Sequence, residues 1–218
     1  MILLFQESTL FYTFMKCKRL EIFSVLEGLK ARNMRIFTPR LFRGVFPVAP
    51  TRIKYFLETA TKKGRIVRLK KGLYAVKTPL PSEEEIANVL YQPSYISFEY
   101  ALMKHGILPE MVYAVTSATT KPTRLFTVGG LGYSYLTIGE RAFIGYTLQN
   151  ENVSGETRSV LFAEPEKALA DYLYFVALGR KTLNDRLILE RLDKKKIIQY
   201  ANLFNNRKLL SLIDSLYA

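Results

Sequence analysis

The spacing of apolar residues predicts a helix at the start of the organised part of the chain. Ile22 is followed by Val25, Leu26 and Leu29, which are three, four and seven residues further on. This spacing places all four side chains on one face of a helix within residues 16–33.

A second helix is predicted from its start signal. Thr38 is a good N-cap residue, and Pro39 then occupies the first helical position, where its missing N–H has no cost. We expect this helix to run from Pro39 to about Arg43 and to end at Gly44.

A third helix opens at residues 48–51 and reaches Lys63, with Gly64 as its C-terminal break. Its predicted apolar face consists of Ile53, Phe56, Leu57 and Ala60. Its predicted polar face consists of Thr51, Tyr55, Glu58 and Lys62, flanked by Arg52, Lys54 and Thr59.

After Gly64 the pattern changes from helical spacing to alternation. Residues 65–69 and 73–76 are predicted strands, and the basic turn 70–72 joins them into a β-hairpin. Three short helices followed by a basic hairpin are typical of a winged helix-turn-helix, which we assign to residues 16–78.

A proline-containing linker, residues 78–81, precedes a second predicted domain over residues 82–218. That domain opens with a capping box formed by Ser82 and Glu85, and its first helices end at Gly106. Strands are predicted over residues 112–115, 124–128, 133–138, 142–146 and 159–162, and helices follow from residue 164. The expected fold class is α+β: an N-terminal winged helix-turn-helix, then a mixed domain of helices around a small, mostly antiparallel sheet.

Charge is distributed unevenly between the two predicted domains. Residues 16–78 carry 17 Lys and Arg against three acidic residues, a net charge of +14, whereas residues 79–218 carry 15 of each sign. A basic excess confined to one domain indicates a polyanionic partner, and double-stranded DNA suits a winged helix best. The predicted DNA-binding residues are Thr38, Arg40, Arg43, Thr51, Arg52, Lys54, Tyr55, Lys62, Lys63, Arg65, Arg68, Lys70 and Lys71.

Glu58 is an acid on the face that is predicted to meet DNA, where phosphates would repel it. Two interpretations remain open: its carboxylate accepts a hydrogen bond from a cytosine amino group, or it orients Arg52 or Lys62. From the sequence, the orienting role is favoured.

The sequence indicates no enzyme, no catalytic residue, no metal site and no cofactor. His105 is the only histidine and precedes Gly106, so its expected role is a C-cap interaction. Residues 129–132 form a predicted hairpin turn rather than a phosphate-binding loop. Glu164, Glu166 and Asp171 are interpreted as acids that favour a helix N-terminus, and Lys167 is counted among the surface lysines.

The expected location is the cytoplasm. Cys17 is the single cysteine, no signal-peptide cleavage site is found, and no run of 18 apolar residues would span a membrane. Residues 1–15 are assigned as an extension of open order, which is either a loose tail ahead of a start at Met15 or a segment docked on the fold.

Five short segments resemble AbiEi-type antitoxins and occur in the order found in that family. The first is the hairpin sequence 65–74. It ends with the basic residue Lys71, then Gly72, an apolar residue and Tyr74. The others are residues 85–88, 93–97, 101–107 and 164–171. Together they cover roughly residues 20–180.

The resemblance implies a type IV toxin–antitoxin, or abortive infection, system. Its antitoxins repress their own promoter by binding inverted repeats through the winged helix, for which a dimer on DNA is one suitable arrangement. Their C-terminal domain counteracts a nucleotidyltransferase-like toxin, with direct contact left open. The alternative is an RNA- or protein-binding accessory module without sequence-specific DNA binding.

Overall fold

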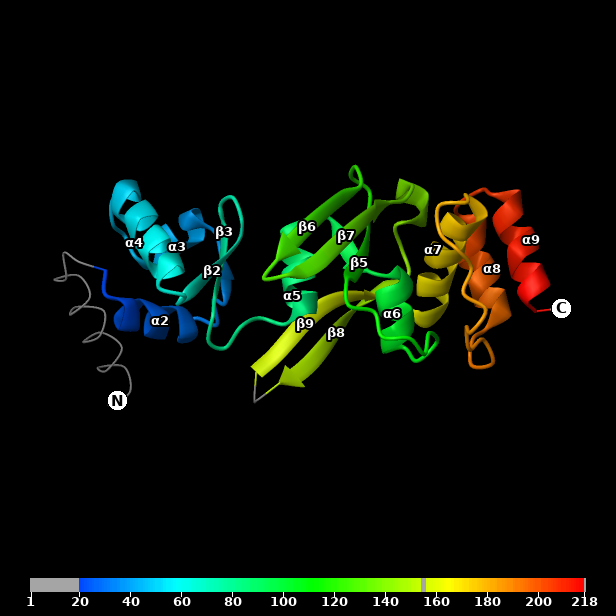
Figure 1. The fold of residues 1–218 in the computed structure, drawn as a ribbon, viewed down its shortest axis with the longest axis horizontal. Coiled ribbons are helices and arrows are strands. Elements are labelled where there is room, and N and C mark those ends of the chain that lie inside the picture. The colour runs from blue at the N-terminus through cyan, green and yellow to red at the C-terminus, as the bar shows by residue number, and fades with distance from the viewer. Residues whose placement is uncertain (1–19, 154–155, 218) are drawn as a thin grey trace, which may run out of the picture. The chain divides into compact units, whose positions relative to one another are not determined.

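The computed structural model describes residues 20–153 and 156–217, which divide into two compact units between Pro81 and Ser82 (Figure 1). The predicted extension over residues 1–15 lies outside the described residues. The described part of the chain is a mixed α+β structure with eight α-helices and two β-sheets. None of these helices combines the length and the apolar character that a membrane crossing requires.

The first unit contains three helices and a three-stranded antiparallel sheet. The strand order in this sheet is β1-β3-β2, and the β2–β3 hairpin pairs Val67 with Ala75 and Arg68 with Tyr74. In chain order its elements are α2 (Ile22–Lys30), β1 (Ile36–Phe37), α3 (Pro39–Val45), α4 (Pro50–Lys62), β2 (Ile66–Lys70) and β3 (Leu73–Val76).

The predicted apolar face of the third helix is confirmed, because all four of its residues are buried in the core of this unit. Aromatic rings join the elements around that core. Phe42 of α3 lies 5.6 Å from Phe37 of β1, 4.7 Å from Phe46 and 5.7 Å from Phe56 of α4, measured between ring centroids. Three elements, α3, β1 and α4, thereby pack around one aromatic side chain.

One sequence prediction in this unit needs correction, and one strand was missed. Gly44 does not end α3, which continues to Val45. The backbone N–H of Phe46 donates to the Phe42 carbonyl at 2.8 Å, and burial of Phe46 favours the two additional helical residues. Strand β1 was not predicted, because two residues are too short to show alternation. Only its pairing with β3 makes it a strand.

The second unit is built on one six-stranded sheet with the order β6-β7-β5-β4-β9-β8. Three neighbouring pairs are antiparallel, and two, β5 with β7 and β4 with β9, are parallel. Its strands are β4 (Ser94–Ile96), β5 (Val115–Thr119), β6 (Arg124–Val128), β7 (Leu131–Thr137), β8 (Tyr146–Val153) and β9 (Glu156–Ala163). Its helices are α5 (Glu83–Leu90), α6 (Phe98–Lys104), the short 3₁₀ helix η1 (Glu140–Ala142), α7 (Pro165–Ala177), α8 (Lys194–Asn202) and α9 (Arg207–Leu216).

Helix starts and tight turns in the second unit follow the prediction, whereas several strands do not. The capping box is confirmed, because the Ser82 hydroxyl oxygen accepts from the Glu85 N–H at 3.2 Å and the Glu85 carboxylate accepts from the Ser82 N–H at 2.8 Å. Gly129 and Gly130 form the turn of the β6–β7 hairpin, both with positive φ. That conformation favours glycine there.

The strand predicted over residues 142–146 is wrong, since this stretch contains the end of η1 and Gly145 with φ 74° before β8 begins at Tyr146. The strand predicted over 112–115 begins only at Val115 and continues through small and polar residues to Thr119, all of them buried. Strand β4 and most of β8 were missed, because a three-residue strand and a polar edge strand give little periodic signal.

Helices α7, α8 and α9 lie side by side at one end of the second unit (Figure 1). Polar contacts fix α8 to the start of α7: the Tyr200 hydroxyl donates to Glu164 at 2.5 Å, and Lys196 lies 3.0 Å from the same carboxylate. Side-chain caps begin both C-terminal helices, Asp193 for α8 and Asn206 for α9. The helices predicted from residue 164 onwards are confirmed as α7, α8 and α9 in the described part of the chain.

These contacts make the stability of the second unit depend on pH. The hydrogen bond from Tyr200, followed by that from Lys196, holds the pKa of Glu164 below its ordinary value of 4.5. A carboxyl group with a lowered folded-state pKa stabilises the fold above its unfolded pKa, and this contribution is lost as pH falls through the folded value.

We therefore expect acidification from about pH 6 to about pH 3 to destabilise the wild-type chain more than Tyr200→Phe, as measured by urea unfolding at each pH. Tyr217→Phe is the matched control, because the Tyr217 hydroxyl is buried without a hydrogen-bond partner among the described residues. Equal acid sensitivity of the wild type and Tyr200→Phe would contradict this assignment.

Candidate nucleic-acid interface

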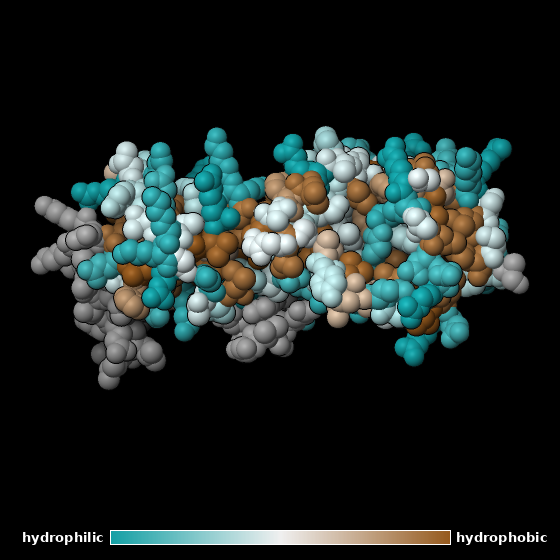
Figure 2. Space-filling view, viewed as in Figure 1, coloured by the Kyte–Doolittle hydropathy of each residue, from teal (hydrophilic) through white to brown (hydrophobic). Residues whose placement is uncertain are grey.

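The structure places the thirteen predicted DNA-binding residues on three neighbouring elements of the first unit. They lie at α3 and its N-cap, along α4 and its C-cap, and along the β2–β3 hairpin. Figure 2 shows hydrophilic side chains projecting over this part of the molecule. Eleven of the thirteen are exposed; the half-buried ones are Thr38 and Lys70.

Thr38 has a structural task at this surface. Its hydroxyl oxygen accepts a hydrogen bond from the Leu41 N–H at 3.2 Å and so caps α3. This contact fixes the direction in which α3 begins, and with it the exposed positions of Arg40 and Arg43.

Helix α4 presents a ridge of four exposed residues on the side away from the core. Thr51, Tyr55, Glu58 and Lys62 follow one another at intervals of four, three and four residues, the repeat of one helix face. Tyr55 is 72% exposed although it is aromatic. We call these four residues the α4 ridge.

The hairpin adds cations beside this helix and is tied to the core. Tyr74, opposite Arg68, stacks on the core residue Phe37 with ring centroids 6.3 Å apart. The register shifts between Arg68 and Lys70, and an irregularity of this kind increases the local twist of a hairpin. Lys71 lies in the turn, next to Gly72 with φ 77°.

The electrostatic character of the first unit follows from its composition and from the lack of internal neutralisation. Residues 20–81 contain 14 basic and three acidic residues, a net charge of +11. Among the predicted DNA-binding residues, eight exposed basic ones make no ion pair with any residue that the structure describes: Arg40, Arg43, Lys54, Lys62, Lys63, Arg65, Arg68 and Lys71. Charges of one sign without internal partners attract a polyanion.

A buried polar cluster in the second unit was missed by sequence reasoning. Lys167 and Asp171 are fully buried and form an ion pair within α7, so Lys167 is not a surface lysine and Asp171 is not an acid of the first helical turn. The Asp171 carboxylate also accepts from Tyr95 at 2.9 Å and from Ser97 at 2.7 Å. Their four-residue spacing inside an apolar stretch was the available signal.

The cluster has no solvent-accessible member that could meet a substrate. Burial raises the pKa of Asp171, an effect that Lys167 and the two hydroxyl groups oppose. The Lys167 ammonium lies 4.8 Å from the ring centroid of Phe204, which follows α8. We infer that this cluster holds α7, β4 and the C-terminal helices together.

His105 occupies the C-cap of α6, as expected, and its ring also contacts a residue outside this helix. The ring nitrogen Nε2 lies 2.9 Å from the carbonyl oxygen of Ala163 at the end of β9. The predicted C-cap interaction is confirmed through the backbone, and the ring adds a contact between α6 and the sheet. No group of three or more His, Cys, Asp or Glu side chains among the described residues is placed to hold a metal ion.

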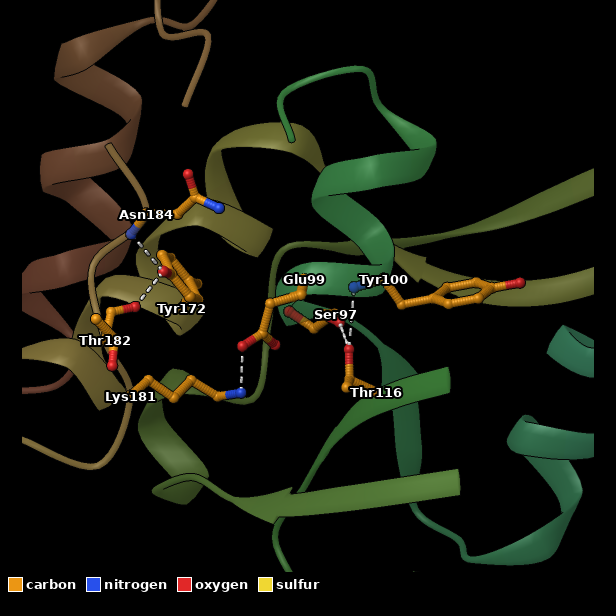
Figure 3. A network of polar contacts seen from close by, with 8 residues as sticks. All are labelled: Ser97, Glu99, Tyr100, Thr116, Tyr172, Lys181, Thr182 and Asn184. Atoms are coloured by element: carbon orange, nitrogen blue, oxygen red, sulfur yellow. Dashed lines mark hydrogen bonds and ion pairs between the residues drawn. The ribbon is translucent and has the colours of Figure 1, made fainter. Parts of the chain in front are cut away.

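A shallow hollow of about 460 Å³ lies between α6, α7 and the segment after α7 in the second unit. Figure 3 shows Lys181 reaching the Glu99 carboxylate, while the Tyr172 hydroxyl donates to the Thr182 carbonyl at 2.6 Å and accepts from the Asn184 N–H at 3.0 Å.

Two ion pairs neutralise four of the five charged side chains that line this hollow, and the fifth is Asp185. Besides the Lys181–Glu99 pair, Arg186 lies 3.2 Å from Glu110. The hollow therefore has less unpaired charge with which to attract a charged ligand than the basic surface of the first unit has.

Neither a model of a protein family nor a curated protein sequence matches the chain. The interpretation of the basic surface therefore depends on its geometry and on the short motifs described above.

Proposed function

We propose that the first unit is a winged helix-turn-helix that binds double-stranded DNA, and that the chain is a transcriptional autorepressor and antitoxin of the cytoplasm. The element order supports the first part. Helices α3 and α4 are joined by residues 46–49 alone, a connection of the length found in helix-turn-helix motifs, and an antiparallel hairpin follows.

The α4 ridge carries this proposal. A helix of 13 residues is about 20 Å long, and its polar face fits the major groove, which is about 12 Å wide. Ridge residues reach base edges, while flanking Lys54 and Lys63 and the hairpin's Arg65, Arg68 and Lys71 meet phosphates. The core behind α4 holds the helix in place without using any ridge side chain.

For the second unit we propose the counteraction of a nucleotidyltransferase-like toxin. The short-motif resemblance supports this role, and the absence of a net charge over residues 79–218 separates it from the DNA-binding role of the first unit. Residues 164–171, one of the resembling segments, contain the buried Lys167–Asp171 pair. In this unit the motif therefore coincides with the cluster that joins α7 to its neighbours.

An electrophoretic mobility shift on the DNA upstream of the chain's own reading frame tests the DNA-binding part. We expect preferred binding to this duplex over random duplex, with an affinity that falls steeply as salt rises. Tighter binding to transfer RNA than to upstream DNA would favour the alternative of an RNA-binding module. Equal affinity for all duplexes would refute sequence-specific repression.

Co-expression tests the antitoxin part. If a nucleotidyltransferase encoded beside this chain arrests growth, co-expression of the full chain should restore growth. Restoration by residues 82–218 alone would assign the effect to the second unit, whereas no restoration by the full chain would refute the antitoxin role.

A further inference from the structure

We propose that Glu58 is a specificity-determining residue, whose carboxylate accepts a hydrogen bond from the N4 amino group of a cytosine in the major groove. This inference rests on the proposed DNA-binding function and assigns a base class to the α4 ridge. Its support comes from the position of Glu58, the lack of an internal partner and the electrostatic cost of an acid there.

Glu58 lies near the middle of the outward side of α4. With about 100° per residue, it is roughly 150° around the helix from the centre of the buried face. It is exposed, as are its ridge neighbours Thr51, Tyr55 and Lys62. A side chain at this position contacts any molecule that binds to the outward side of α4.

The Glu58 carboxylate makes no polar contact within the described part of the first unit. Lys54 and Lys62 are four residues before and after Glu58, the spacing at which helical ion pairs form. Nevertheless, Glu58 makes no ion pair or hydrogen bond through its side chain with any described residue. The favoured sequence interpretation, that it orients Arg52 or Lys62, is therefore replaced by the other one.

An acid at this place has an electrostatic cost that only a specific donor offsets. The described first unit has three acids, and the other two, Glu21 and Glu27, lie at α2. Phosphates repel a carboxylate in the groove, so Glu58 weakens binding to DNA in general. A group that weakens binding to every wrong sequence but is accepted at the right one creates specificity.

The chemistry of base edges identifies the donor. Guanine presents two acceptors and thymine one acceptor in the major groove, and these repel a carboxylate. Adenine has its amino group next to the acceptor N7, whereas cytosine presents its amino group as the only polar atom. A lone carboxylate thus fits cytosine best.

The test uses the full chain, a library of random duplexes and three variants. The wild type should select duplexes with cytosine at one position, preferred by about 5- to 150-fold over other bases, the usual cost of one mismatched base pair. Glu58→Ala should lose this preference and bind random duplex more tightly than the wild type. Glu58→Gln should shift the preference towards adenine, because an amide can bond to N6 and N7 together.

Glu27→Ala is the matched control, since it removes an exposed acid from another helix of the same unit. It should leave the base preference unchanged. Thermal unfolding followed by circular dichroism verifies that each variant is folded at the temperature of the binding assay.

The outcomes separate this inference from the function on which it rests. If the wild type selects a sequence and Glu58→Ala selects the same base at every position, the inference is overturned and the DNA-binding function stands. If Glu58→Ala binds all duplexes more tightly by one common factor, the carboxylate only repels, which also overturns it. If the wild type shows no preference among duplexes, sequence-specific binding fails, and the inference fails with it.

Discussion

Replacing Arg65, Arg68 and Lys71 together by glutamine should weaken binding to every DNA duplex by about 100-fold at physiological salt. Each phosphate contact releases close to one counterion, so the loss of three contacts should also reduce the slope of log affinity against log salt by about 2.7. All three side chains are exposed, and none is in an ion pair with a described residue. The fold should therefore tolerate the change.

The matched control replaces three exposed basic residues of the second unit, Arg180, Arg191 and Lys195, by glutamine. It changes the net charge of the chain equally but leaves the hairpin intact. Fluorescence anisotropy over a series of salt concentrations measures both variants. If the control lowers affinity and slope as much as the hairpin variant, the effect belongs to net charge and not to the hairpin.

Lys167→Met should destabilise the second unit by about 3–5 kcal/mol. The substitution leaves the Asp171 carboxylate buried without its counter-charge, and breaking a buried pair at one partner costs more than the pair contributes. Urea unfolding followed by tyrosine fluorescence measures the loss, because the chain has 14 tyrosines and no tryptophan.

Lys181→Met provides the comparison for this prediction. Lys181 and Glu99 also form an ion pair, but their side chains are 20% and 25% exposed. Solvent screening limits the expected loss to about 1 kcal/mol or less. A loss for Lys167→Met that does not exceed the loss for Lys181→Met would contradict the role assigned to the buried cluster.

Features governed by local chemistry could be predicted from the sequence. Thr38 and Ser82 start helices because their hydroxyl oxygens reach backbone N–H groups three residues later, a contact that needs no tertiary partner. The buried face of α4 and the hairpin after Gly64 were predicted for the same reason: periodicity is a property of consecutive residues.

Features that depend on distant partners were missed. Strand β1 exists through β3, and the polar strand β8 exists through β9, with which it pairs along its whole length. Burial of Lys167 is tolerated because it pairs with Asp171, whose carboxylate also accepts hydrogen bonds from Tyr95 and Ser97. These two residues are more than 70 positions from Asp171 along the chain. The residue type alone does not tell a buried lysine or aspartate from an exposed one.

By itself, the sequence determined a basic first unit with a polar face on α4, because charge count and helical spacing do not depend on how the chain packs. Only the tertiary structure decided which charged side chains are neutralised inside the protein and which face outward. It placed Lys167 in the core and left Glu58 exposed without a partner among the described residues. The physical reason is that the energy of a charge depends on burial and on neighbours within a few ångströms, which folding brings together from distant positions.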